Sequence, residues 1–252
     1  MSLIKWIIGS LFLASFLAVV IGNRVGKTVP VSTETVVSEN VINKVRIADA
    51  EFNYTFFVTD PRKIKLVANF DDKNSSEAIS DSNDCEKGIN GSFYNQNREP
   101  LAGWEANGNV RKNITHNNLL NGYIGLSESN FFWLGREIPE EPMKWGMQAG
   151  PVLMTQGKKE VLNMATDKPA RRSVAGITST GQAVMISVFL ENSRYDGPTL
   201  ELLPEVILKI NETESLQIDR ALNLDGGSAS AYYTQTYKLP ELIAVGSFLC
   251  VN

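Results

Sequence analysis

The chain has 252 residues, of which 43% are hydrophobic and 21% are charged, and its formal net charge is −4. This length and composition are typical of a globular protein with one ordinary domain. Because there is no surplus of basic residues to neutralise a phosphate backbone, nucleic acid is not an expected partner.

The first predicted element is an export segment. Lys5 precedes an uncharged, apolar stretch over residues 6–22, which is intermediate in length between a signal-peptide core and a full membrane span. A cleaved signal and an uncleaved membrane anchor are therefore both open. Either one predicts an exported protein, periplasmic or otherwise extracytoplasmic. We assign residues 1–26 to the signal or anchor, residues 27–43 to a flexible spacer, and residues 44–252 to the folded domain.

Strand patterns dominate this domain. Residues 53–60 and 63–70 flank the turn signal Asp60-Pro61, so a hairpin is expected there. The polar stretch 71–87 is expected to form a loop or a short surface helix. Further strands are expected in INGSFY (89–94), GYIGL (122–126), FFWLG (131–135), AGPVLM (149–154), VAGIT (174–178) and QAVMISVFL (182–190).

One longer helix is expected between residues 198 and 215, where leucine and isoleucine recur at spacings of three and four. Pro204 falls inside this stretch, so the helix either begins there or is kinked. Strands with one or two inserted helices predict an α+β fold with mixed β-sheets in a single domain.

The cysteines and the histidine limit the chemistry that is available. Export would allow Cys85 and Cys250 to form one disulfide that ties the start of the domain to its end, whereas two separate buried thiols are the alternative. There is no CxxC motif, and His116 is the sole histidine. We therefore predict no metal-ligating residues.

Three segments place polar groups at the ends of predicted strands. Asn90 and Gly91 present side-chain and backbone amides after an apolar residue. Arg172, beside a second arginine, offers a guanidinium fork that suits phosphate or carboxylate. In ALNLDGGSAS (221–230) an apolar run stops at Asp225, and the glycines that follow can arrange their N–H groups as a nest for an anion. Taken singly, the segments with Asn90 and Asp225 also fit ordinary turns, and Arg172 also fits a surface arginine pair.

Serine-hydrolase chemistry is disfavoured. Residues 226–230 partly resemble the nucleophile elbow GxSxG, but Ser230 stands where the last glycine belongs. The only available base, His116, lies in an asparagine-rich stretch that is typical of a solvated loop.

Taken together and in order, the segments resemble the phosphodiester glycosidase family. The resemblance is carried by NGSFY (90–94), EPLAGW (99–104), QAGPVLM (148–154), RRSVAGIT (171–178) with Gly181, and ALNLDGGSAS (221–230). It runs from about Gly88 to the C-terminus. Ser92 follows Asn90-Gly91 where the family commonly has another glycine, and Ala175 replaces a bulkier aliphatic residue, so the sugar specificity is left open.

The resemblance implies an α+β fold and hydrolysis of a sugar that is linked through its anomeric carbon to a phosphodiester. It implies catalytic roles for Asp225, Arg172 and Asn90, and substrate-binding roles for Gly226, Gly227, Ser228, Ser230 and Gly91. Arg172 and the amides of residues 226–228 are expected to hold the phosphate. Asp225 is expected to act at the anomeric carbon, as general base for water or as stabiliser of the cationic sugar, while Asn90 and Ser230 orient sugar hydroxyls.

The expected partners are a sugar phosphodiester or envelope glycan, and the membrane through the N-terminal segment. The sequence requires no cofactor and leaves a divalent cation open. The alternative function is a non-catalytic envelope protein that binds a glycan or phosphoglycan.

Overall fold

The computed structural model describes residues 42–252. The predicted export segment and nearly all of the predicted spacer lie outside these residues. Neither helix within residues 42–252 has the length and apolar character that a membrane span requires.

The described chain forms three β-sheets and two α-helices. The first sheet has the order β1 (Asn43–Ile47), β2 (Ala50–Thr59), β13 (Ala183–Phe189), β12 (Arg172–Thr178), β14 (Ile218–Asn223), β10 (Val152–Thr155) and β11 (Lys158–Lys159). The second has the order β16 (Lys238–Leu239), β15 (Tyr232–Thr234), β4 (Lys87–Asn90), β17 (Ser247–Val251) and β3 (Ile64–Ala68). The third has the order β6 (Asn109–Lys112), β5 (Trp104–Ala106), β9 (Met143–Ala149), β7 (Gly122–Ser127) and β8 (Phe132–Gly135).

The predicted α+β class in a single domain is confirmed. The expected mixed sheets are corrected, because every described strand pair is antiparallel. Pairs such as β1 with β2, β12 with β13 and β7 with β8 are joined by short turns. A short turn can join only antiparallel neighbours, since parallel strands need a long crossover connection.

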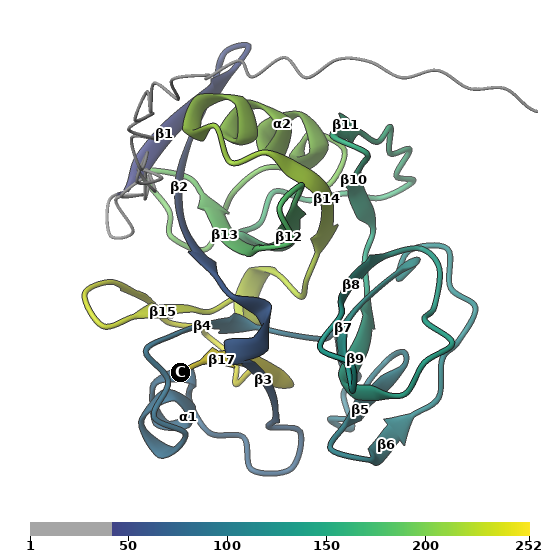
Figure 1. Cartoon of the computed structure of the whole chain (residues 1–252). Helices are drawn as coiled ribbons and strands as arrows, with labels where there is room; N and C mark the ends of the chain where they lie inside the picture. The colour runs from purple at the N-terminus through teal and green to yellow at the C-terminus, as the bar shows by residue number, and fades with distance from the viewer. Residues whose placement is uncertain (1–41) are drawn as a thin grey trace, which may run out of the picture. The chain divides into compact units, whose positions relative to one another are not determined.

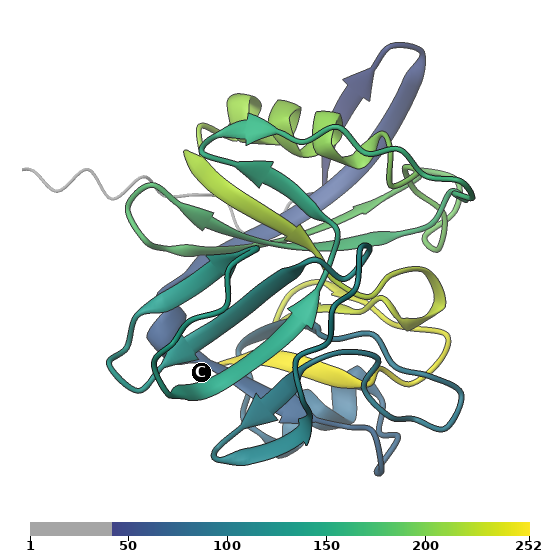
Figure 2. The same cartoon turned by 90° about the vertical axis from the view of Figure 1, so that its right-hand side faces the viewer.

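The large sheet is covered on both faces (Figures 1 and 2): α2 (Leu203–Glu214) lies on one side and the two smaller sheets lie on the other. Alternation along β13 explains this arrangement. Val184 and Ile186 pack in the core shared with α2, whereas Met185 packs in the core shared with the smaller sheets. A strand buried on both faces reads as a continuous apolar run.

The predicted long helix is confirmed as α2, which begins at Leu203, so Pro204 lies at its start and does not kink it. Pro204 lies in its first turn, where a missing N–H breaks no helical hydrogen bond. Leu203, Ile207 and Ile210 form its buried stripe. The polar stretch 71–87 contains α1 (Ser76–Ser82), which is the short helix allowed by the sequence.

The expected hairpin around Asp60-Pro61 is wrong. Residues 61–63 form a 3-10 turn in which the Asp60 side chain accepts a hydrogen bond from the Arg62 amide at 2.9 Å. The turn passes the chain from β2 in the large sheet to β3 in the second sheet, where β3 pairs with the C-terminal strand β17. Local turn chemistry fixes the bend, but the strand partners come from distant parts of the chain.

Of the two alternatives for the cysteines, the structure has the disulfide. Cys85, just after α1, is bonded to Cys250 in β17 across a sequence separation of 165 residues. The bond ties the chain just after α1 to the C-terminal strand β17, and the alternative of two separate thiols is wrong.

Candidate functional site

The predicted segments meet where strand ends of the large sheet and the second sheet come together. Asn90 is the last residue of β4, Arg172 is the first of β12, and Asp225 follows β14 after one further residue. The Asp225 amide donates to the Gly91 carbonyl at 3.1 Å, and the Leu224 amide donates to the Ser173 carbonyl at 2.8 Å. The turn that carries Asp225 is thus bonded to both sheets.

A buried hydrogen-bond network built on Asn90 holds this turn. The Asn90 Nδ2 donates to the Asp225 carbonyl at 2.6 Å, and its Oδ1 accepts from the Ser173 hydroxyl at 2.6 Å and from the Ala231 amide at 2.9 Å. The Ser173 and Ser230 hydroxyls lie 2.8 Å apart. Asn90 is 1% exposed, and Ser173 and Ser230 are fully buried. Asn90 and Ser230 therefore position the main chain around Asp225, instead of presenting polar groups to solvent.

The Asp225 carboxylate is partly buried at the edge of this network. Burial raises its pKa from 3.8 to about 7, because an ionised carboxylate loses hydration there. A hydrogen bond from the Gly226 amide to Oδ1 at 2.9 Å and the charge of Arg98 act in the opposite direction. A carboxyl group with a pKa near neutrality can exchange a proton at physiological pH.

Arg98 is a residue of the site region that the sequence analysis missed. Its guanidinium lies 4.1 Å from the centre of the Tyr94 ring, and it donates hydrogen bonds to four main-chain carbonyls. The acceptors are the carbonyls of Asn69, Phe70, Ala244 and Val245. Arg98 is one of the non-glycine residues with positive φ, at 66°. No sequence pattern marks such a residue, since the carbonyls that it binds lie about 30 and 150 positions away.

Both arginines of the Arg171-Arg172 pair are buried, so the surface alternative is wrong. Arg171 donates to the carbonyls of Ser230, Pro240 at 2.7 Å and Arg194 at 3.0 Å. Burial lowers its pKa to about 10, so it remains cationic at neutral pH.

Arg172 lies beside the glycine turn. Its Nε donates to the Pro198 carbonyl at 2.9 Å, and its Nη2 donates to the Lys168 carbonyl at 2.7 Å and to Asp167 at 3.3 Å. Burial lowers its pKa, and the charge of Asp167 opposes that shift. Its Nη1 has no hydrogen bond within residues 42–252 and would lie 3.9 Å from a Cβ added to Gly226. This nitrogen is the end of the guanidinium that lies nearest to the glycine turn and has no partner among the described residues.

The glycine turn only partly matches the predicted anion nest. The Gly226 amide donates to Asp225, and the Gly227 amide donates to the Arg171 carbonyl at 2.8 Å. The Ser228 amide donates no hydrogen bond within the described chain, and Ser228 is exposed. Gly227 has φ of 61°, which glycine tolerates best. Two of the three amides expected to bind phosphate are therefore engaged within the chain.

Gly91 is required by close packing. A Cβ at this position would lie 2.4 Å from the Ser247 hydroxyl oxygen. The Gly91 amide also donates to the Ser247 carbonyl at 2.8 Å, so β17 approaches the Asn-Gly segment directly. Gly91 thus serves the packing under Asp225.

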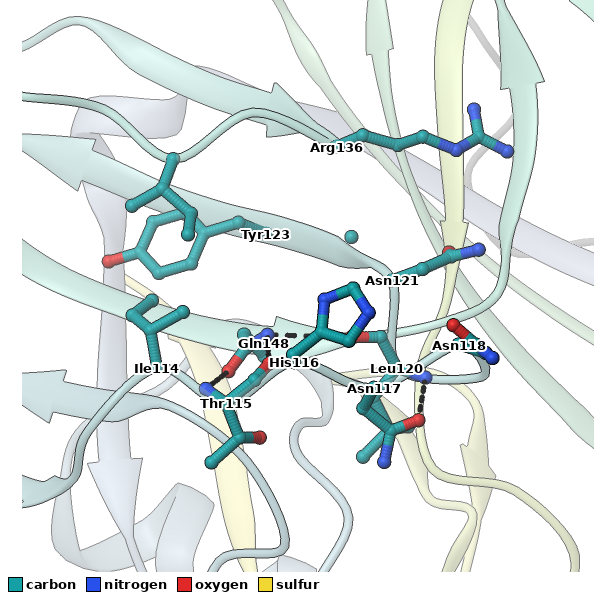
Figure 3. Close-up of a pocket in the computed structure, with 12 residues that line it drawn as sticks. Ile114, Thr115, His116, Asn117, Asn118, Leu120, Asn121, Tyr123, Arg136 and Gln148 are labelled. Atoms are coloured by element: carbon teal, nitrogen blue, oxygen red, sulfur yellow. Dashed lines mark hydrogen bonds between the residues drawn. The ribbon is translucent and has the colours of Figure 1, made fainter.

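A separate cavity of about 400 Å³ lies beside the loop that carries His116 (Figure 3). Gln148, from the segment QAGPVLM, holds this loop: its Oε1 accepts from the amides of Gly103 at 2.8 Å and Thr115 at 2.7 Å. None of the predicted catalytic residues lines the cavity. His116 and Ser228 share no hydrogen bond in the described structure, so a serine-hydrolase pair is not formed there.

Among residues 42–252, no group of three His, Cys, Asp or Glu side chains is placed to hold a metal ion.

The sequence model described as phosphodiester glycosidase matches residues 83–250. No curated protein sequence matches the chain. The solved catalytic domain of zebrafish N-acetylglucosamine-1-phosphodiester alpha-N-acetylglucosaminidase, auto-inhibited by its pro-peptide, is similar with a TM-score of 0.63 and 13% identity, over 84% of this chain and 81% of that one. A hypothetical protein from Synechocystis is similar with a TM-score of 0.60 and 16% identity, over 82% of this chain and 61% of that one.

Proposed function

The chain belongs to the phosphodiester glycosidase family, and on that premise we propose that it hydrolyses the bond between the anomeric carbon of a sugar and a phosphodiester. The observation that supports this most is the convergence of three separate sequence segments on the turn that carries Asp225. Asn90 bonds the Asp225 main chain, and the free Nη1 of Arg172 lies beside the neighbouring glycine. The site thereby pairs a group that can move a proton with a cation that can hold an anion.

Asp225 acts at the anomeric carbon in this proposal. Its carboxylate takes a proton from water as the water oxygen bonds to the anomeric carbon, and the bond from that carbon to the phosphate oxygen breaks. The phosphate departs as a monoester anion and carries away the bonding electrons. Because this leaving group needs little protonation, a second carboxylic acid is less necessary than in ordinary glycosidases.

Phosphate binding is assigned to Arg172 Nη1 and the Ser228 amide, which are the donors left unengaged at the turn in the described structure. Hydrogen bonds from both donors would be strongest in the transition state, because negative charge builds there on the departing phosphate. Gly226 and Gly227 contribute by leaving room for the ligand. Asn90 and Ser230 act as positioning residues, because both are buried and bonded beneath the turn.

For the substrate we propose an N-acetylhexosamine 1-phosphodiester or a related phosphodiester of an envelope glycan. The name of the zebrafish relative supports the sugar class, and the similarity to that protein is at the level of the fold. We place the protein outside the cytoplasm, with attachment to the membrane through residues 6–22. The Cys85–Cys250 disulfide supports the compartment, since such bonds persist where the environment is oxidising.

The test is to incubate the full-length protein with a panel of 1-phosphodiesters of N-acetylglucosamine, glucose and galactose and to measure free sugar. Asp225→Asn is the test variant. Asp49→Asn, which removes an exposed carboxylate at the turn between β1 and β2, is the matched control. We expect sugar release by the wild type and the control but not by Asp225→Asn. Full turnover by folded Asp225→Asn would refute the assignment.

Binding without cleavage is the second candidate function. It is favoured by one observation, namely that two of the three turn amides already donate within the chain. It predicts saturable binding of the same phosphodiesters with no release of free sugar, by wild type and Asp225→Asn alike.

A further inference from the structure

A second cleft, of about 640 Å³, lies between the second and third sheets. One wall is the strand β3, and the other includes Trp104, Ala106 and Trp145 from β5 and β9. Figure 1 shows β3 on the side of its sheet that faces β5 and β9. The volume lies within the range of small-molecule pockets, about 300 to 1,000 Å³.

The main chain of β3 is unpaired on the side that faces this cleft. β3 is the last strand of its sheet and pairs only with β17. The Asn69 amide donates to the Gly246 carbonyl, so Val67 is also bonded toward β17, whereas Leu66 and Ala68 direct their N–H and C=O groups away from it. Within the described residues these outward groups of Leu66 and Ala68 have no hydrogen bond.

Trp145 limits the free edge at one end. Ile64 directs its carbonyl outward in the same way, and this oxygen accepts a hydrogen bond from Trp145 Nε1 at 3.1 Å. The unpaired stretch therefore begins after Ile64 and runs to Ala68. Trp104, which lines the cleft, has a buried indole N–H without a partner among the described residues.

The charged residues that line the cleft are all cationic, although the chain as a whole has a net charge of −4. They are Arg62, Lys65, Arg111 and Lys144. Arg62 and Arg111 each form an ion pair with an aspartate outside the lining, while Lys65 is exposed and forms no ion pair in the described structure. The cleft therefore favours a ligand with negative charge.

We propose that this cleft binds an extended acidic segment of a partner protein, which adds as a further strand to β3. An extended peptide offers alternating N–H and C=O groups, with which the unpaired main-chain groups of Leu66 and Ala68 can form hydrogen bonds. A glycan fits less well, because Trp104 and Trp145 are only 3% and 4% exposed and offer no open ring face for a sugar. The acidic side chains of the segment lie near Lys65 and Arg111.

The test uses a fluorescein-labelled hexapeptide of alternating valine and glutamate, and its lysine counterpart, with the full-length protein. Fluorescence anisotropy measures binding. We expect saturable binding of the acidic peptide only. Lys65→Glu should raise its Kd at least about threefold, since an attraction becomes a repulsion. Lys158→Glu makes the same charge change on the exposed strand β11, outside the cleft, and should leave the Kd unchanged.

Two methylated peptides separate strand addition from attraction by charge alone. Methylating every second backbone amide removes the donors along one edge of an extended peptide and leaves its side chains intact. One of the two alternate methylation patterns should abolish binding, and the other should preserve it. Equal binding of both methylated peptides, or an unchanged Kd in Lys65→Glu, would overturn the proposal. So would saturable binding of polygalacturonate without binding of the acidic peptide.

Discussion

Replacing Asp225 by asparagine should make the protein more stable while removing its proposed activity. The wild-type carboxylate has a pKa of about 7 in place of 3.8, and the difference corresponds to an upper limit of about 4 kcal/mol against folding when the group is ionised. Because water still reaches this partly buried side chain, about 1 to 2 kcal/mol is the expected size. Asparagine keeps an oxygen that can accept the Gly226 hydrogen bond but carries no charge.

The sign of the effect fixes its pH dependence. A carboxyl group whose pKa is raised by folding binds its proton more tightly in the folded state, so wild-type stability falls as pH rises from about 4 to about 7. The advantage of Asp225→Asn should therefore grow across this window and level off above it. For a chain of this size, 1 to 2 kcal/mol is an increase in Tm of roughly 2 to 8 °C.

Activity should change in the opposite direction. If Asp225 is the general base, wild-type kcat/KM should rise with pH through an apparent pKa near 7, and Asp225→Asn should lower it by roughly 10² to 10⁴. Thermal unfolding from pH 4 to pH 8 and release of free sugar are the two assays, with Asp49→Asn as the control. No gain in Tm at pH 8 would refute the reasoning about burial, and activity that rises toward low pH would refute the role as base.

Three further variants test the surroundings of the site. Asn90→Ala removes three hydrogen bonds, two of them buried and one partly buried, so we expect a loss of about 2 to 4 kcal/mol in urea unfolding and a fall in kcat larger than the change in KM. Gly91→Ala should cost about 1 to 3 kcal/mol by the same measurement, and Ser247→Gly in the same chain should restore part of it. Changing both Cys85 and Cys250 to serine should lower stability by about 2 to 5 kcal/mol, and added reductant should then have no further effect on Tm.

Much of the fold could be predicted because local patterns determine it. The apolar run in β13 and the leucine and isoleucine spacing in α2 each report burial directly, and Pro204 marks the start of the helix. Strand partners were harder to predict. Asp60-Pro61 correctly indicates a bend, but only the C-terminal strand β17 decides that β3 leaves the large sheet. Neither the sequence of β3 nor that of β17 alone indicates that these two distant strands pair.

The residues of the candidate site could likewise be predicted from local patterns, whereas their separate roles could not. Asn90 and Asp225 could be singled out because polar groups and glycines stop apolar runs at both positions. Their separate tasks could not be predicted, since these depend on which groups are buried. The Asn90 side chain looks like a ligand-facing amide in the sequence, yet its hydrogen bonds are to the Asp225 carbonyl, the Ser173 hydroxyl and the Ala231 amide.

Burial of the Asp225 carboxyl group also explains why motifs that are weak singly can together identify this site. The turn at Asp225 holds a carboxylate whose ionisation opposes folding, so the rest of the structure must stabilise that turn. Asn90 from the second sheet and Ser173 from the large sheet do so through bonds that are each modest. A change in any one partner leaves the others buried without a bond, which costs more than the bond itself contributed. We therefore expect double variants of Asn90 and Ser173 to lose less stability than the sum of the single variants, and additive losses would contradict this account of the site.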